Sequence, residues 1–163
     1  MRDTLSKLRE HWAVGHATPT GGASEQEIQA FQNTFEIQMP EDLHRYFREV
    51  NGMRPDWRYD QDSNGFTFWT LSRVQPLSVV TPRGSVDWSD SRLNSNEVQY
   101  FVFADYLGES WWYAIGLAKR NAYTPVVIIS HPNELVAQSF SEFLDLYFVD
   151  SPKVYPSRGS RRT

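Results

Sequence analysis

Apolar side chains recur every three or four residues in four stretches of the chain, which is the spacing of one face of an α-helix. Two of these stretches open with the capping box Ser-x-x-Glu, formed by Ser24 with Glu27 and by Ser139 with Glu142. The pattern therefore predicts helices over residues 4–14, 24–35, 40–50 and 139–149.

The third of these stretches carries signals for both of its ends. In "MPEDLHRYFREVNG", residues 39–52, Pro40 has its φ angle pre-set for the first position of a helix. Glu41 and Asp42 follow at the positive end of the helix dipole, and Gly52 supplies a left-handed stop. Together with the preceding helix, this segment predicts a helical hairpin that must bury its apolar stripes against a larger element.

Aromatic and β-branched residues dominate four other runs, which predicts β-strands. The last three runs are joined by short turns with no helical pattern between them, so they favour an antiparallel meander. We expect an α+β domain in which an antiparallel sheet of about four to six strands is packed by an N-terminal helix pair and a C-terminal helix. The four runs are "FTFWTL" (66–71), "VQYFVFADY" (98–106), "WWYAIGL" (111–117) and "PVVIIS" (125–130).

Three segments interrupt these patterns. Residues 15–22 contain Pro19 and two glycines and are expected to link the first helix to the domain, so residues 1–22 form an N-terminal helix and linker and 23–150 the α+β domain. Residues 78–97 are polar and predict a long insertion between strands. Residues 151–163 combine prolines, small polar residues and arginines, which predicts a flexible basic tail.

Composition narrows the class of protein. The chain has 163 residues and no cysteine, which excludes disulfides, thiolate zinc sites and thiol nucleophiles. The N-terminal segment has charges every few residues and no continuous apolar run, so we expect neither a signal peptide nor a membrane span. These features predict a cytoplasmic protein that does not act on membranes.

The charge is unevenly distributed along the chain. Residues 1–150 hold all 20 acidic residues and 12 of the 16 basic ones, whereas the other four basic residues follow in 151–163. An acidic body disfavours nucleic acid and favours a basic partner, although solubility alone would explain the same balance.

No stretch predicts catalysis or a cofactor. The four histidines lack the spacing of metal ligands, and Ser130 beside His131 reads as the end of a strand. "DQDSNG" matches the start of a calcium-binding loop, but Leu71 stands where the bidentate glutamate belongs, so a polar turn is the simpler interpretation. Asp105 and Glu109 are the nearest acid pair for a hydrolase, and the sequence alone does not bring them into one pocket. We expect no enzyme and no bound cofactor or metal.

The tryptophans suggest interaction surfaces or lids over the core. Trp57 and Trp88 stand in polar, Asp-rich segments, where a large ring either anchors an interface or covers a core edge. Trp111 and Trp112 are neighbours in one expected strand, so their side chains point to opposite faces and only one can face a single core.

The order of these signals resembles the SUKH superfamily, which contains Smi/Knr-type yeast cell-wall regulators and bacterial toxin-immunity proteins. The resemblance covers residues 23–149. It is carried by "ASEQEIQAFQNTFEIQMPEDLHRYFREVNG" as the helix pair, "YFVFADYLGESWWYAI" as the central strand pair and "SFSEFLDLYF" as the closing helix. Met39, Leu43 and Arg48 depart from the residues usual in the family's helix motif, and the central turn lacks a Gly-Asp pair.

The resemblance implies a non-catalytic, protein-binding domain, and for bacterial members an immunity protein that neutralises a cognate toxin, often a nuclease. A basic toxin domain as partner agrees with the acidic body. The alternative is a carbohydrate-binding or cell-wall-linked regulatory module, in which exposed rings stack on sugars. The expected partner contacts are Trp57, Asp60, Asp62, Asp87, Trp88, Asp90, Trp111 and Trp112.

Overall fold

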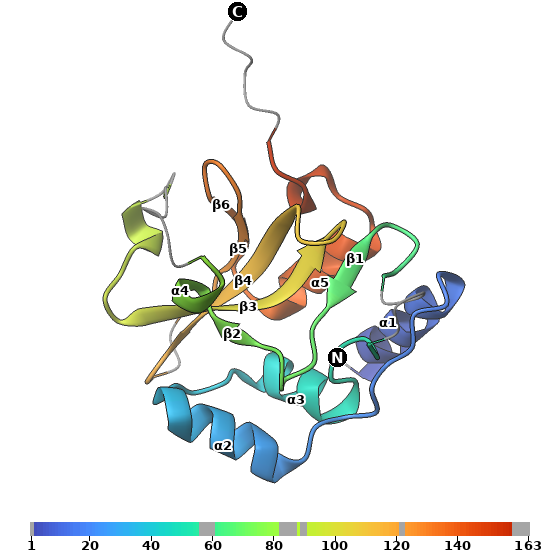
Figure 1. Ribbon diagram of the computed structural model, residues 1–163, viewed down its shortest axis with the longest axis horizontal. Helices are drawn as coiled ribbons and strands as arrows, with labels where there is room; N and C mark the ends of the chain where they lie inside the picture. Colours follow the sequence, from blue (N-terminus) through green and yellow to red (C-terminus); the bar gives the residue numbers. More distant parts are fainter. Residues whose placement is uncertain (1, 56–60, 82–87, 89–90, 121–122, 158–163) are drawn as a thin grey trace, which may run out of the picture.

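A computed structural model describes residues 2–55, 61–81, 88, 91–120 and 123–157. Within these residues the chain forms helices around one antiparallel sheet (Figure 1), which confirms the predicted α+β class. The α-helices are α1 (Arg2–Val14), α2 (Glu25–Phe35), α3 (Glu41–Glu49), α4 (Leu77–Val80) and α5 (Phe140–Phe148), with 3-10 turns η1 (Ser91–Leu93) and η2 (Pro152–Val154). The strands are β1 (Phe66–Phe68), β2 (Gln75–Pro76), β3 (Val98–Tyr106), β4 (Trp111–Ala118), β5 (Val126–Ile129) and β6 (Glu134–Ala137).

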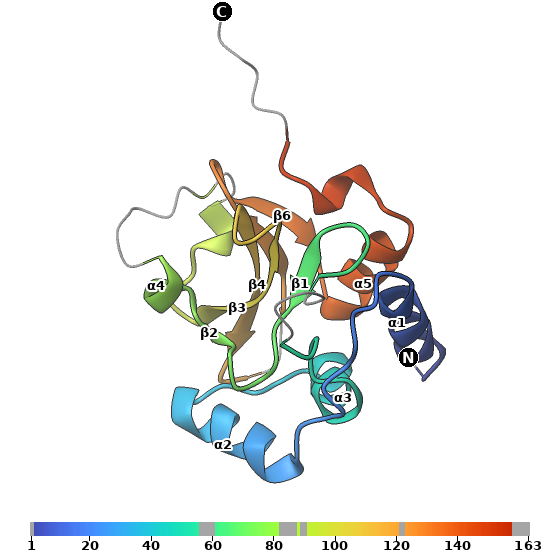
Figure 2. The ribbon, with the colours of Figure 1, turned by 45° about the vertical axis from the view of Figure 1, so that its right-hand side comes forward.

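The sheet has the order β1-β3-β4-β5-β6, and β2 also pairs with β3. Helices α1, α3 and α5 lie on one side of it, whereas α4 lies on the other (Figure 2). We call these sides the helix face and the outer face. Because side chains alternate along a strand, residues that are paired across strands share a face.

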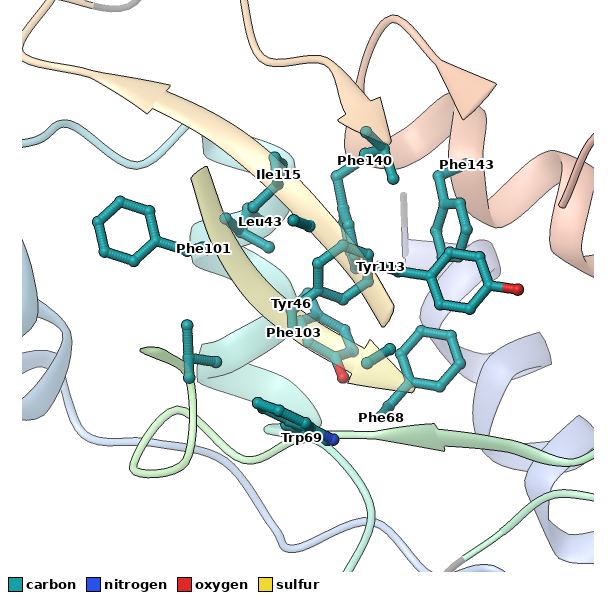
Figure 3. Packing of buried hydrophobic residues seen from close by; sticks show 14 of the residues in the cluster. Leu43, Tyr46, Phe68, Trp69, Phe101, Phe103, Tyr113, Ile115, Phe140 and Phe143 are labelled. Atoms are coloured by element: carbon teal, nitrogen blue, oxygen red, sulfur yellow. The ribbon is translucent and has the colours of Figure 1, made fainter. Parts of the chain in front are cut away.

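The core on the helix face is built from aromatic rings, and Phe68 of β1 is at its centre. Its side chain has no exposed area. Figure 3 shows its ring near those of Tyr113 and Phe143, between the strands and α5. The ring therefore joins β1 to β3 and to three helices, because its neighbours within 6.4 Å between centroids are Trp12 of α1, Tyr46 of α3, Phe103 of β3, and Phe143 and Tyr147 of α5.

The Asn51-Gly52 pair that follows α3 holds the end of this helix against residues 69–71, next to β1. Asn51 has a left-handed φ of 56°, and its side-chain oxygen accepts a hydrogen bond of 2.8 Å from the backbone N–H of Leu71. Gly52 has φ 71°, and a Cβ atom there would lie 2.4 Å from the backbone carbonyl of Trp69. At the other end of α3, the Asp42 carboxylate accepts hydrogen bonds from the backbone and hydroxyl of Ser141 in α5. This stretch is therefore structural.

Two segments that flank the expected α+β domain contribute to its core. Leu5, Leu8 and Trp12 of α1 have no exposed area and belong to the same apolar cluster as the sheet. The predicted tail is also ordered at its start, since Val154 is fully buried and its carbonyl accepts a hydrogen bond from the Tyr113 hydroxyl. Both flanking segments therefore add residues to the core, and residues 158–163 lie outside the described part.

The predicted polar insertion at 78–97 is only partly a loop. It overlaps α4 and contains η1, whose Leu93 is buried. No periodic pattern predicts β2 or β6, which have two and four residues. No helix among the described residues is long and apolar enough to span a bilayer.

Truncation of Phe68 tests the central position of its ring. Phe68→Ala should lower the free energy of unfolding by about 4 kcal/mol, because it leaves a cavity where β1, β3 and three helices meet. Urea unfolding followed by tryptophan fluorescence measures the loss. Val79→Ala on α4 is the control, since Val79 is 57% exposed and its truncation should change stability by less than about 0.5 kcal/mol. Similar losses for both variants would contradict this account of the core.

Candidate protein-binding face

Four of the eight expected contact residues lie in the described part of the chain. Trp57, Asp60, Asp87 and Asp90 fall outside it. Asp62, Trp88, Trp111 and Trp112 are described, and the structure places them in four different environments.

Asp62 is not a surface contact, which corrects the expectation from sequence. Its side chain has no exposed area. One carboxylate oxygen accepts hydrogen bonds from the backbone N–H groups of Asn64 and Phe66, at 2.8 and 2.9 Å. The other accepts a hydrogen bond from the Tyr147 hydroxyl, which in turn accepts one from the indole of Trp12. A buried carboxylate needs such partners, so Asp62 holds the turn before β1 against α1 and α5.

Trp111 lies on the helix face, where it covers the edge of the core. It is paired across the strands with Tyr106, and the two rings stack with centroids 4.4 Å apart and planes inclined by 14°. Its indole N–H donates a hydrogen bond of 2.9 Å to the Tyr113 hydroxyl. One face of the ring and its only polar group are therefore engaged within the chain.

Trp88 lies over one end of the outer face. Its ring packs on that of Tyr100, with centroids 4.7 Å apart, and its backbone forms a parallel bridge with Asn133. Tyr100 also donates a hydrogen bond of 2.7 Å to the carbonyl of Leu93. Trp88 thus covers sheet residues at this end, and it is half-buried.

The other end of the outer face carries Trp112 and a polar pocket. Trp112 is half-buried and is paired across the strands with Asp105 of β3, which is paired in turn with Thr67 of β1. Beside these strands is a hollow of about 240 Å³, which we call the Asp105 pocket. It is lined by Gln61, Thr67, Arg73, Asp105, Gly108 and Glu109.

Asp105 is held in this pocket by hydrogen bonds from two directions. One oxygen accepts a bond of 2.7 Å from the indole N–H of Trp69, and the other accepts one of 3.1 Å from the backbone N–H of Glu109. The residue is 2% exposed. Burial raises the pKa of the Asp105 carboxyl above its ordinary value of 3.8, although the Trp69 hydrogen bond and the charge of Arg73 act in the opposite direction.

Arg73 lies at the rim of the pocket. Its guanidinium carbon is 4.1 Å from the centre of the Trp69 ring, the geometry of a cation–π contact. One nitrogen is 3.4 Å from a Glu109 carboxylate oxygen and 3.8 Å from an Asp105 oxygen. Neither Trp69 nor Arg73 can be recognised from sequence as part of the site, because their contacts with Asp105 span more than thirty residues.

The structure brings Asp105 and Glu109 into one pocket, which the sequence alone did not. The two acids share it with the guanidinium of Arg73, and the oxygens of Asp105 already accept two hydrogen bonds. Among the residues that the structure describes, no group of three or more His, Asp or Glu side chains could hold a metal ion.

A larger hollow of about 830 Å³ lies away from this face, between β6 and the C-terminal segment. Its carboxylates are engaged within the chain. Glu134 accepts hydrogen bonds from the backbone and hydroxyl of Ser157, and Asp150 accepts one of 2.5 Å from the Tyr155 hydroxyl. These contacts hold the C-terminal segment beside β6, so we regard this hollow as part of the fold.

Comparison with known proteins supports the resemblance seen in the sequence. Residues 22–146 match the model of the SMI1 / KNR4 family (SUKH-1), and this match covers more than half of the chain. The chain belongs to the SUKH-1 family. The match spans α2, α3, the whole sheet and most of α5. The strands that carry the Asp105 pocket therefore belong to the SUKH-1 domain. Among curated proteins, none matches the chain closely enough to be a relative.

The raised pKa of Asp105 predicts a pH dependence of the stability of this SUKH-1 domain. The folded protein holds the Asp105 proton more tightly than the unfolded chain does. The contribution of this group to the free energy of unfolding is therefore fully present below about pH 3.8 and decreases as the pH rises through the raised pKa. Asp105→Asn should remove this part of the pH dependence. Urea unfolding at a series of pH values from acidic to neutral measures it.

Glu97→Gln is the matched control, because Glu97 is an exposed carboxylate just before β3. This variant should keep the pH dependence of the wild type. If Asp105→Asn followed the same curve as the wild type, the pKa of Asp105 would not be raised by burial.

Proposed function

We propose that this protein is a non-catalytic immunity protein that binds and neutralises a cognate toxin domain in the cytoplasm. Membership of the SUKH-1 family is the observation that carries the proposal, because the family includes such immunity proteins. The partner is a protein rather than nucleic acid or a membrane, since the 20 acidic residues in residues 1–150 outnumber the 12 basic ones. A basic toxin, such as a nuclease domain, complements this charge.

The outer face at the Asp105 end supports recognition better than the other tryptophan sites. There a half-buried tryptophan, Trp112, lies beside a polar pocket, and large aromatic residues at the centre of a patch are common anchors of interfaces. Trp88 and Trp111 each have one ring face packed on a tyrosine of the chain. The same packing leaves less ring surface for sugar stacking, so it disfavours the carbohydrate-binding alternative.

The direct test of this function begins with the neighbouring reading frames. A toxic domain encoded beside this chain should inhibit growth when it is expressed alone, and co-expression of the chain should restore growth. The purified pair should also form a stable complex. A neighbouring toxin that the chain neither binds nor neutralises would refute the proposal, and binding of glycans seen by tryptophan fluorescence would favour the alternative.

The contact face is tested by truncation of Trp112. Trp112→Ala should weaken toxin binding by at least about 2 kcal/mol, which is about a 30-fold increase in Kd, because an anchor at an interface centre loses its packing. Isothermal titration calorimetry measures the change. Tyr123→Ala is the matched control, since Tyr123 is an exposed aromatic residue beyond the opposite end of β4.

A triple variant gives the sharper outcome. If alanine at Trp57, Trp88 and Trp112 together left toxin binding unchanged in a folded protein, the proposed face would be wrong. Circular dichroism establishes whether the fold is retained.

A further inference from the structure

Asp105 carries a charge that the protein itself does not fully pair. Each carboxylate oxygen accepts one hydrogen bond within the chain, from Trp69 and from Glu109, although each has room for a second. Among the described residues, the nearest cation is Arg73 at 3.8 Å, which is too far for a hydrogen bond. A buried carboxylate whose counter-charge is not hydrogen-bonded to it favours the binding of a further cation.

Thr67 offers a second free acceptor at the same place. It is directly opposite Asp105 on β1, it lines the Asp105 pocket, and it is only 6% exposed. Its hydroxyl has no hydrogen-bond partner among the described residues. The hydroxyl can therefore accept a hydrogen bond from a donor that enters the pocket.

Arg73 does not fill this position. Its guanidinium is stacked on Trp69 and its side chain is 46% exposed, so it lies at the rim of the pocket rather than inside it. Among the residues that the structure describes, the pocket is lined by two carboxylates, of Asp105 and Glu109, and by this guanidinium. One further positive charge would therefore make the group neutral.

We propose that the Asp105 pocket binds the ammonium group of a lysine side chain from the protein partner. An ammonium group has three donors, which match the acceptors of Asp105, Thr67 and Glu109. A volume of about 240 Å³ suits the end of one side chain. The assignment of this lysine to a toxin rests on the function proposed above, whereas the pocket itself can be tested without any toxin.

The test is an NMR titration of the full chain with Nα-acetyl-lysine-N-methylamide. The indole N–H signal of Trp69 reports on the site, because this group is bonded to Asp105. We expect saturable shifts of this signal and of the Thr67 amide. The norleucine analogue, which has the same stem without the charge, should cause none. Equal shifts with both probes would overturn the proposal.

Two variants attribute the binding to the pocket. Asp105→Asn should weaken binding of the lysine probe about tenfold or more, since it removes a charged acceptor. Thr67→Val should also weaken it while the bond between Trp69 and Asp105 is kept, so the test remains decisive if the first variant does not fold. Glu97→Gln is the control and should bind as the wild type does. Unchanged binding of the lysine probe to a folded Asp105→Asn or Thr67→Val variant would overturn the proposal that this pocket binds the ammonium group.

The two proposals can fail separately. If the lysine probe binds in the pocket but the neighbouring toxin does not bind the chain, the immunity function is wrong and the pocket is correct. If the toxin binds Asp105→Asn and Thr67→Val as tightly as it binds the wild type, the function is supported and the pocket is not its contact.

Discussion

The buried carboxylate of Asp62 is the interaction on which the arrangement of the helices and the sheet depends. It fixes the turn before β1 through two backbone N–H groups, and through Tyr147 and Trp12 it reaches α5 and α1. Burial, together with the negative charge of Asp62, raises the pKa of the Tyr147 hydroxyl, so this group remains a donor at ordinary pH. Because every member has a partner, the network specifies one position for β1, and Phe68 can then occupy the centre of the aromatic core.

This placement of β1 has a consequence for the outer face. Because Phe68 points toward the helices, Thr67 and Trp69 point to the other side of the sheet, where the indole N–H of Trp69 donates a hydrogen bond to Asp105. The Asp105 pocket and the core are therefore set by the same strand. The opposite end of the outer face is covered by Trp88, η1 and α4. The Thr67–Asp105–Trp112 end of the outer face thus combines a half-buried tryptophan with polar groups that have unused bonding capacity.

The helices could be predicted from sequence because their signals are local. The box of Ser24 and Glu27 is present as expected, and the left-handed Asn51 follows α3. The roles of Asp62 and Asp105 could not be predicted in the same way, because their partners are far away in sequence. Tyr147 is 85 residues from Asp62, and Trp69 is 36 residues from Asp105. The short β2 and β6 carry no periodic pattern, and Val154 is one apolar residue in a polar segment.

The two buried aspartates show how the same side chain acquires different roles. Asp62 accepts hydrogen bonds on both oxygens, from the turn before β1, from β1 and from α5. Asp105 has two donors, a cation at 3.8 Å that is not hydrogen-bonded to it, and an adjacent hollow. Burial of an incompletely paired charge lowers stability, and a fold keeps such a group without loss only when something else completes its pairing. In the free protein this cost is reduced by Trp69 and Arg73, whereas a bound cation would remove more of it. The Asp105 carboxylate is already positioned and removed from water in the free protein. A basic partner would therefore bind a site that needs little rearrangement.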